Sequence, residues 1–418
     1  MPPIAELADS NKEKTVNRKI SLGIAISLVA IGCAITFVLT WTVSLSTYNT
    51  KISSSEKYDG VYQKLQEMDV TVRNNFIYAG AMNNEALETA VINGYVSGIG
   101  DKYATYMPAQ TYYELQQTSS GVVNGAGFEA EADGSGYLRI TNVYKGGSAE
   151  ANGVVAGDVI TEIDGRSLLS MEEGAALERI AGEIGTKLTL RLVRSGEELT
   201  VNLIRQQIDI SSVSDEMLSD NIGYIRITSF NAKTSEQFSN SLNSLIADGA
   251  KALIIDLRQN GGGIISALKP MLNRILPAAV IATAEYAGGV TKTLIETDSE
   301  EFIDLPIAVL VDGGTASAAE LFAVALRDVH NARLIGTQTY GKAVIQTQYE
   351  FSDGSALSLT TATIIPYKSK QTYDGVGLKP DYLTELPSGA SIEYLPHETD
   401  SQLQKAIEIL SPQANPQQ

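Results

Sequence analysis

The spacing of hydrophobic positions changes several times along the chain, and each spacing predicts a different kind of element. Residues 20–43 form a long, mainly apolar run with no charged residue, whereas apolar side chains in 56–118 recur at helical spacing. Short strand-like runs separated by glycine turns fill 119–206. Strand-like runs alternate with helical stretches over 207–390, and a last helical pattern lies within 391–418. The pattern predicts a multidomain α+β protein.

The amino-terminal part has the features of a membrane anchor. Residues 1–19 are polar and contain four basic side chains, and the apolar run 20–43 is long enough to cross a bilayer as a helix. The basic flank predicts a cytoplasmic tail over 1–19, with the remainder of the chain outside the cytoplasm. A cleaved signal peptide is the alternative, but the run is longer than a usual signal core and no small-x-small site follows it.

The region 207–390 is expected to form a parallel or mixed sheet covered by helices. Apolar strands are predicted at 222–227, 251–257 and 307–311, with helices at 234–246 and from Ile264 onward. Two antiparallel pairs are expected later in the sequence. One turns at Gly288-Gly289, and the other joins 344–351 to 356–365.

Composition excludes several kinds of function. The formal net charge of −18 argues against nucleic acid as the main partner. The single cysteine, Cys33, cannot form an intrachain disulfide, and with only His330 and His397 the chain lacks an ordinary set of zinc ligands. We therefore expect neither a metal nor another cofactor.

Ser317 lies where a predicted strand turns into a predicted helix. The strand 307–311 is followed by Asp312-Gly313-Gly314, and an alanine-rich helical stretch begins just after Ser317. A hydroxyl at such a corner is held rigidly beside backbone N–H groups that still lack partners. The alternative is a plain helix N-cap, and we expect Glu320 to cap the same helix.

Lys342 is the candidate base for this serine. It follows Gly341 and precedes an apolar run, and burial among apolar neighbours lowers the pKa of a lysine. Gln346 is expected on the same strand face, where its amide would bond the lysine amine. His330 and His397 are interpreted as a helix-capping and a solvent-facing residue, which favours lysine by elimination.

A glycine run, Gly261-Gly262-Gly263, follows the predicted strand 251–257. It lacks the Lys-Ser/Thr ending of a phosphate-binding loop. Glycine allows a backbone to approach a reacting carbonyl closely, so the run is a candidate oxyanion-binding loop. The alternative is an ordinary turn at the start of a helix.

These residues together resemble a known family. The segments Thr315-Ala316-Ser317-Ala318-Ala319-Glu320 and Tyr340-Gly341-Lys342-Ala343, with Gln346, are similar to those of the carboxyl-terminal processing peptidases, also called tail-specific proteases. That family uses a Ser/Lys dyad. Two flanking serines and one glycine of the family pattern are replaced here. The resemblance extends over about 58–410. It implies a crotonase-like α/β peptidase core, with Ser317, Lys342 and Gln346 as catalytic residues and Gly262, Gly263 and Ala318 at the oxyanion hole.

Residues 119–206 resemble a PDZ domain. Gly125-Ala126-Gly127-Phe128 is similar to its carboxylate-binding loop, and Gly157-Asp158 through Asp164-Gly165 follows downstream. In such a domain successive N–H groups capture a free chain terminus while the peptide adds as an extra strand. The resemblance implies that Gly125, Ala126, Gly127 and Phe128 bind the C-termini of protein or peptide substrates.

The predicted protein is thus a membrane-anchored, extracytoplasmic serine endopeptidase that recognises substrate tails through its PDZ domain. An inactive PDZ scaffold and a crotonase-like enzyme acting on thioesters are the alternatives. The helical region 56–118 packs on neighbouring subunits in the family that it resembles, which makes a homodimer one hypothesis and an ordinary supporting helical pair the other. Its loop Gly100–Pro108 is also similar to the family.

Overall fold

The computed structural model describes residues 36, 40, 59–171, 173–392 and 394–414. The chain divides into two compact units, Met1–Leu87 and Glu88–Gln418. Apart from Thr36 and Thr40, the predicted membrane helix 20–43 lies outside the described residues, as does the tail 1–19. Among the residues that are described, no helix is both long enough and apolar enough to cross a bilayer.

The predicted helical region 56–118 is mostly helical, but it also contains a strand. Its elements are α2 (Asp59–Asn75), η1 (Ala79–Ala81), α3 (Asn84–Gly98), β1 (Thr105–Met107) and α4 (Ala109–Ser120). Strand β1 pairs antiparallel with β18 of the downstream core. The chain leaves the helical pattern at Gly100, whose φ of +81° suits glycine, and Asp101 then bonds the backbone N–H of Thr360 on β18.

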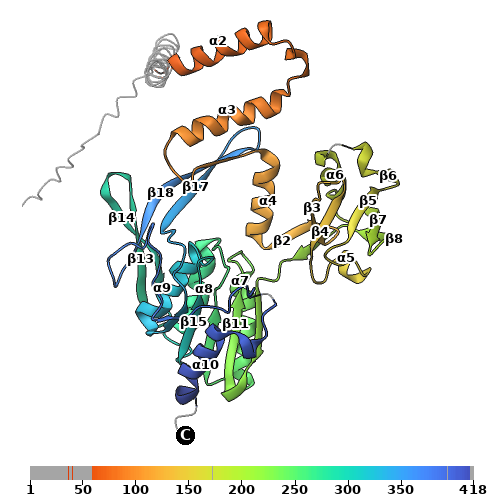
Figure 1. Cartoon of the computed structure of the whole chain (residues 1–418). Helices are drawn as coiled ribbons and strands as arrows, with labels where there is room; N and C mark the ends of the chain where they lie inside the picture. Colours follow the sequence, from red (N-terminus) through yellow and green to blue (C-terminus); the bar gives the residue numbers. More distant parts are fainter. Residues whose placement is uncertain (1–35, 37–39, 41–58, 172, 393, 415–418) are drawn as a thin grey trace, which may run out of the picture. The chain divides into compact units, whose positions relative to one another are not determined.

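The segment that resembles a PDZ domain forms a five-stranded path with one short side strand (Figure 1). Its elements are β3 (Phe128–Ala132), β4 (Leu138–Val143), α5 (Ser148–Ala151), β5 (Val159–Ile163), β6 (Arg166–Ser167), η2 (Leu168–Ser170), α6 (Glu173–Ile180), β7 (Lys187–Arg194) and β8 (Glu197–Ile204). The strand order is β3-β4-β5-β7-β8, with β6 on β5. Alternate residues of β7, Leu188, Leu190 and Leu192, are fully buried, as a strand with one face on a core requires. The chain enters and leaves through a separate antiparallel pair, β2 (Val122–Gly125) and β9 (Gln206–Asp209).

The core that follows is built on a six-stranded sheet of order β10-β11-β12-β15-β16-β19. Its strands are β10 (Val213–Met217), β11 (Ile222–Ile227), β12 (Ala252–Asp256), β15 (Ile307–Val311), β16 (Arg333–Gly336) and β19 (Tyr382–Leu383). All neighbouring pairs are parallel except β10 with β11. The connecting helices are η3 (Ser219–Asn221), α7 (Thr234–Ala247), η4 (Ile265–Ala267), α8 (Leu268–Ile275), α9 (Ala318–His330), η6 (His397–Thr399) and α10 (Ser401–Ala414).

Helices cover both faces of this sheet, so its central strands are mainly apolar, with buried Asp256 at the end of β12 as a charged exception. Leu253 and Ile255 of β12 pack in one cluster with α7, α8 and α9. Ala252 and Ile254 of the same strand pack in another cluster with Leu403 of α10. All five residues of β12 and of β15 are buried, which explains the apolar runs 252–255 and 307–311.

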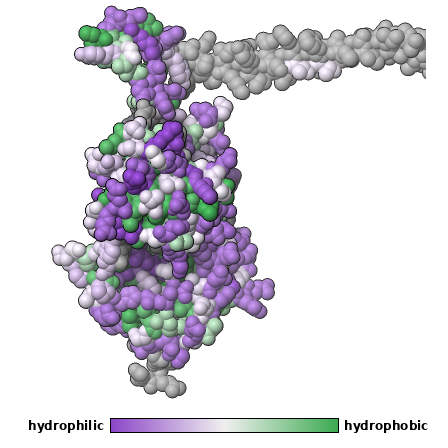
Figure 2. All heavy atoms as spheres, turned by 90° about the vertical axis from the view of Figure 1, so that its right-hand side faces the viewer, coloured by the Kyte–Doolittle hydropathy of each residue, from purple (hydrophilic) through white to green (hydrophobic). Residues whose placement is uncertain are grey.

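A second, antiparallel sheet has the order β1-β18-β13-β14, with β17 also paired to β18. Its elements are β13 (Ala279–Tyr286), η5 (Ala287–Gly289), β14 (Val290–Thr297), β17 (Val344–Glu350) and β18 (Ala356–Pro366). Both predicted antiparallel pairs form here, β13 with β14 and β17 with β18. On the face seen in Figure 2 the surface is mainly hydrophilic, with hydrophobic residues in small groups.

Candidate active site

Three loops that follow parallel strands carry the glycine run, Ser317 and Lys342, whereas Gln346 lies on β17. The loop after β12 holds the glycine run, the loop after β15 ends at Ser317, and the loop after β16 leads to Lys342. Because parallel strands β12, β15 and β16 are neighbours, their carboxyl ends lie at one edge of the sheet. Open α/β sheets place their sites at this edge.

Ser317 occupies a strained corner at the start of α9. Its φ of 56° and ψ of −119° lie outside the regions that non-glycine residues usually adopt. Ser317 is half-buried. It follows a loop in which Asp312 Oδ1 accepts hydrogen bonds from the N–H groups of Gly314 and Thr315. The strain is therefore held by the surrounding hydrogen bonds.

The glycine loop is joined directly to the serine loop. Gln259 donates from its backbone and its side chain to the two carboxylate oxygens of Asp312, at 2.9 and 2.6 Å. The N–H of Ala316 donates to the carbonyl of Asn260 at 2.9 Å. These bonds fix the distance between the candidate nucleophile and the candidate oxyanion loop.

Glycine is required at two positions of this loop. A Cβ on Gly262, where φ is +101°, would lie 2.9 Å from Ser317 Cβ and 3.0 Å from Ala318 N. A Cβ on Gly263, where φ is +139°, would lie 2.0 Å from the carbonyl oxygen of Phe230. Gly262 thus packs against the candidate nucleophile and the first amide of α9, as the proposed oxyanion loop requires.

The three candidate oxyanion amides differ in their hydrogen bonding. The Gly262 N–H donates to Asn260 Oδ1 at 2.8 Å, so it already has a partner in this structure. The N–H of Ala318 lies in the first turn of α9, where backbone donors have no carbonyl within the helix. Gly263 lies at a parallel bridge to Phe230 whose two hydrogen bonds use the backbones of the flanking residues Gly262 and Ile264.

Glu320 connects the serine to the lysine and does more than cap the helix. Its carboxylate is fully buried, and Oε2 accepts from the N–H of Ser317 at 3.0 Å and from the N–H of Lys342 at 2.8 Å. Oε1 accepts from Thr339 Oγ1 at 2.5 Å and from the N–H of Gly341 at 2.8 Å. Four donors satisfy the buried carboxylate, and the two loops converge on it.

The Lys342 side chain is half-buried and has its pKa lowered. Desolvation is the main cause, opposed by the negative charge of Asp101 and assisted by the positive charge of Lys102. Its Nζ lies 4.9 Å from the centroid of the Tyr103 ring. Within the described residues, no hydrogen bond joins this amine to the Ser317 hydroxyl.

Gln346 is oriented differently from the sequence expectation. Its Nε2 donates to Thr360 Oγ1 at 3.5 Å rather than to the lysine amine. The pairing of β17 with β18 is irregular between Ile345 and Gln346, and such an irregularity shifts the alternation of side chains along the strand. Counting alternate residues from Lys342 therefore does not predict the direction of the Gln346 side chain.

Sequence reasoning missed the part of this site that comes from Asp101, Lys102 and Tyr103. Asp101 Oδ1 accepts from Thr360 Oγ1 at 3.0 Å, which brings the loop to the strand beside Gln346. The sequence singled out Gly100–Pro108 only through its family resemblance. No local pattern indicates that this loop contacts Lys342, because the two are far apart in the chain.

Among the described residues, neither histidine forms a hydrogen bond with Ser317. His330 Nε2 lies 3.4 Å from Asp304, and His397 Nε2 lies 3.3 Å from Glu216. Burial lowers the pKa of His330 and favours its neutral form. The geometry therefore gives these residues local partners on the surface and at the end of α9.

The carboxylate-loop candidates are held against the body of their domain. The carbonyl of Ala126 accepts from Ala149 N at 2.8 Å, and the carbonyl of Gly127 accepts from Tyr144 N at 2.9 Å. Gly125 belongs to β2, and Phe128 begins β3. Strand β3 is at the end of the strand order, so one of its edges is open to an added strand.

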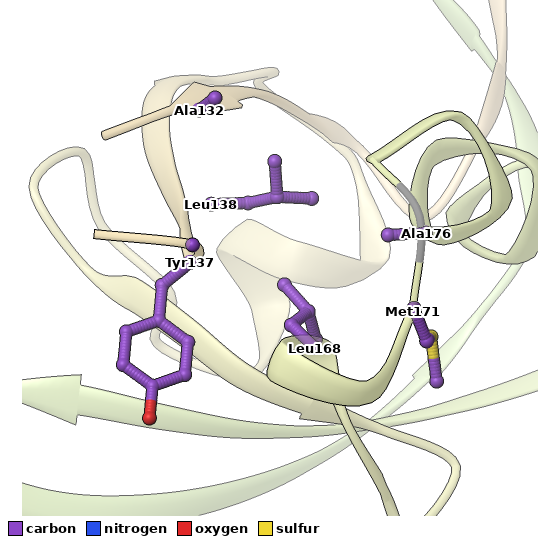
Figure 3. Close-up of a pocket in the computed structure, with 7 residues that line it drawn as sticks. Ala132, Tyr137, Leu138, Leu168, Met171 and Ala176 are labelled. Atoms are coloured by element: carbon purple, nitrogen blue, oxygen red, sulfur yellow. The ribbon is translucent and has the colours of Figure 1, made fainter. Parts of the chain in front are cut away.

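An apolar cavity of about 220 Å³ lies between the end of β3 and the region of α6. Figure 3 shows Leu138 and Leu168 between Ala132 of β3 and Ala176 of α6, with Met171 at the side. This is where the side chains of a strand added to β3 would need apolar contacts.

Comparison with known proteins decides the family. A profile described as peptidase family S41 matches residues 221–384, and a PDZ domain profile matches 139–194. The chain is 31% identical over 383 residues to the carboxy-terminal processing protease CtpA of Bacillus subtilis, covering 91% of this chain and 80% of that protein. The chain belongs to peptidase family S41. This S41 peptidase is a serine peptidase that carries a PDZ domain and binds peptide substrates.

Other S41 relatives show similar coverage. A probable CtpA-like serine protease of Staphylococcus aureus (strain N315) is 30% identical over 400 residues, covering 94% of this chain and 79% of that protein. Among solved structures, a photosystem II D1 C-terminal processing protease is 26% identical, with a TM-score of 0.45, covering 73% of this chain and 84% of that one.

Proposed function

We propose that this S41 peptidase is a membrane-anchored, extracytoplasmic endopeptidase that cleaves proteins whose C-terminal tails bind its PDZ domain, using Ser317 and Lys342 as a dyad. The observation that carries the dyad is the convergence of the Ser317 and Lys342 backbones on one oxygen of Glu320. The depressed pKa of Lys342 supports its role, because only a neutral amine can take a proton.

In the proposed reaction, the neutral Lys342 amine accepts the Ser317 hydroxyl proton as the oxygen attacks the scissile carbonyl. The negative charge that develops on the carbonyl oxygen faces the N–H groups of Ala318 and Gly263. Gly262 joins them when its N–H exchanges Asn260 Oδ1 for the substrate oxygen. The lysine ammonium then returns the proton to the leaving amine, and water hydrolyses the acyl-serine by the same route.

The tail-binding role is supported by the open edge of β3 and the apolar cavity beside it. A substrate tail would pair with β3 and place its terminal carboxylate at Gly125, Ala126, Gly127 and Phe128. The Bacillus subtilis relative is named a carboxy-terminal processing protease. Processing of C-terminal tails is assigned to this chain by analogy with that relative.

The domain plan belongs to this proposal. It has a cytoplasmic tail at 1–19, a transmembrane helix at 20–43, a helical region at 56–118, the PDZ domain at 119–206, the peptidase core at 207–390 and a C-terminal helix and tail at 391–418. The support for anchoring is the uncharged apolar run with its basic flank. Protease digestion of intact cells against lysed cells tests the orientation: an external catalytic domain is digested in both.

We also propose that two chains associate through the helical region. Helix α2 and the segment after it expose hydrophobic side chains, among them Met68 at 55% and Ile77 at 84%. A second copy that presents the same apolar residues would cover them. Sedimentation velocity of the chain and of a Met68→Asp, Ile77→Asp variant tests this, since the double variant should sediment as a monomer.

The experiment for the overall function is mass spectrometry of peptides released from a protein mixture by the wild type and by Ser317→Ala. The proposal predicts products whose new termini disappear completely in the variant, while the variant still binds tail peptides. Undiminished release by Ser317→Ala would refute it.

A further inference from the structure

The loop Asp101-Lys102-Tyr103 contacts the side chain of Lys342 from outside the peptidase sheet. It lies between α3 and β1, upstream of the PDZ domain, and neither of the family profiles covers it. Tyr103 places its ring beside the Lys342 amine, Lys102 brings a second amine to the same ring, and Asp101 bonds Thr360. We propose that this loop is a positioning element of the active site, in which Tyr103 covers the Lys342 amine, Lys102 repels its proton and Asp101 anchors the loop. The inference rests on the proposed dyad.

Asp101 fixes the loop in place. Its Oδ2 accepts from the N–H of Thr360 at 2.9 Å and its Oδ1 from Thr360 Oγ1 at 3.0 Å. Oδ1 also accepts from the N–H of Tyr103 at 2.9 Å, which closes a turn over Lys102, the one residue between the anchor and the ring. Thr360 is the residue that receives the Gln346 amide, so the loop and the lysine strand share one contact point.

Tyr103 presents its ring to two amines. Lys102 Nζ lies 4.5 Å and Lys342 Nζ lies 4.9 Å from the ring centroid. The ring face attracts an ammonium ion, but the ring also excludes water from the lysine amine. Burial has the larger effect on this amine and lowers its pKa. The Tyr103 hydroxyl is buried and raises the pKa of the neighbouring Lys102, but it makes no hydrogen bond of normal geometry to the residues that the structure describes. The contact with Lys342 therefore depends on the ring rather than on the hydroxyl.

Lys102 places a second positive charge beside the first. Its Nζ is also 5.9 Å from the ring centroid of Tyr340, which precedes Gly341 and Lys342 in the chain. Two ammonium groups near one ring repel each other, so the more buried amine gives up its proton more readily. Lys102 is the more exposed of the two and keeps its charge in water.

The remaining charged and titratable groups around Lys342 come from two other elements. Glu320 of α9 accepts a hydrogen bond from the backbone N–H of Lys342, and Asp374 accepts one from the backbone N–H of Ala343 at 3.0 Å. Tyr373 is buried near Glu320 and Asp374, and burial together with their negative charges raises the pKa of its hydroxyl. These groups hold the lysine backbone, whereas the loop groups surround the amine.

The experiment measures the protonation of Lys342 without using catalysis. In a Ser317→Ala background, competitive acetylation with acetic anhydride over a range of pH, read by peptide mass spectrometry, gives the pH at which the Lys342 amine becomes reactive. Lys102→Gln should move this midpoint upward, because the repelling charge is removed. Tyr103→Ala should also move it upward, because water reaches the amine. Tyr103→Phe should leave it unmoved, as should the matched surface change Lys251→Gln.

The same substitutions in the active enzyme are followed by kcat/KM for a tail peptide against pH. Lys102→Gln should lower kcat/KM roughly two- to fivefold on the acid side and restore it at higher pH. If neither Lys102→Gln nor Tyr103→Ala changes the acetylation midpoint of Lys342 relative to the Ser317→Ala parent, the inference is wrong. A midpoint that moves while the acid limb of kcat/KM does not supports the inference and refutes the dyad. Thermal unfolding of each variant identifies any loss of fold. If Tyr103→Ala unfolds, the test rests on Lys102→Gln, which changes a more exposed residue.

Discussion

The backbone N–H groups of Ser317 and Lys342 donate to the same carboxylate oxygen, Oε2 of Glu320, at 3.0 and 2.8 Å. The serine begins α9, and the lysine belongs to the loop after β16. Each of these two backbone nitrogens is thus within one hydrogen bond of the same oxygen atom. A buried carboxylate, rather than a direct side-chain bond, holds the two candidate catalytic segments together in this structure.

Glu320→Gln should therefore impair both catalysis and stability. The amide retains one acceptor oxygen but turns its NH₂ toward N–H groups that can only donate. We expect the free energy of unfolding to fall by about 2–4 kcal/mol and kcat to fall about 100-fold or more. Urea unfolding and steady-state kinetics measure the two effects. Glu236→Gln, an exposed first-turn glutamate of α7, is the matched control, and wild-type kcat in Glu320→Gln would contradict the role given to this carboxylate.

Gly262→Ala should lower kcat about 100-fold or more, because its Cβ would lie 2.9 Å from Ser317 Cβ and its φ is positive. The KM for a tail peptide should change much less, since the proposed function assigns tail binding to the PDZ domain. Gly261→Ala is the control, because a Cβ at the neighbouring Gly261 has no atom within 4 Å. Equal kcat values for the two variants would show that the close approach of the glycine loop has no catalytic importance.

Gln346→Ala should be much milder than loss of the lysine. Its amide bonds Thr360 rather than Lys342, so it supports the strand and the Asp101 anchor. We expect kcat/KM to fall about threefold to tenfold, a loss that suits an indirect contact. Thr360→Val, which removes the shared hydroxyl, should behave in the same way. Complete inactivity of a folded Gln346→Ala would indicate that the amide contacts the reacting atoms.

Arg258→Met should destabilise the core strongly. The guanidinium is 1% exposed and lies between Asp256 and Asp400, at 2.6 and 2.8 Å, where the two carboxylates raise its pKa against the effect of burial. Its removal leaves two buried carboxylates unpaired, which should cost about 3–5 kcal/mol of unfolding free energy. Urea unfolding tests this, with Arg333→Met on the exposed side of β16 as the control. A loss below that of the control would contradict the importance of the pair.

The sequence predicted the parts of the fold that local patterns encode. Strands β11 and β15 coincide with the strands predicted at 222–227 and 307–311. The strand–turn–helix junction around Ser317 also has the predicted form, because glycine turns and helix propensity act over a few residues.

The missed features depend on contacts between distant segments. Strand β1 forms because β18 offers an edge, and its three residues carry no strand pattern of their own. The irregular pairing at Ile345 and Gln346 alters which way the glutamine points, and a count of alternating residues does not detect it. The partner of the Gly262 amide is a side chain two residues away, which depends on the conformation of the loop.

The most direct test of the account is hydrolysis of a tail peptide by Lys342→Met, which keeps the length and apolar packing of the side chain but removes its amine. The depressed pKa of Lys342 predicts that the wild type is active above that pKa and loses activity as the pH falls through it, because the ammonium cannot accept the serine proton. Lys342→Met should show no cleavage above background at any pH, with tail binding unchanged. Cleavage by the folded variant within about tenfold of the wild type would contradict the dyad.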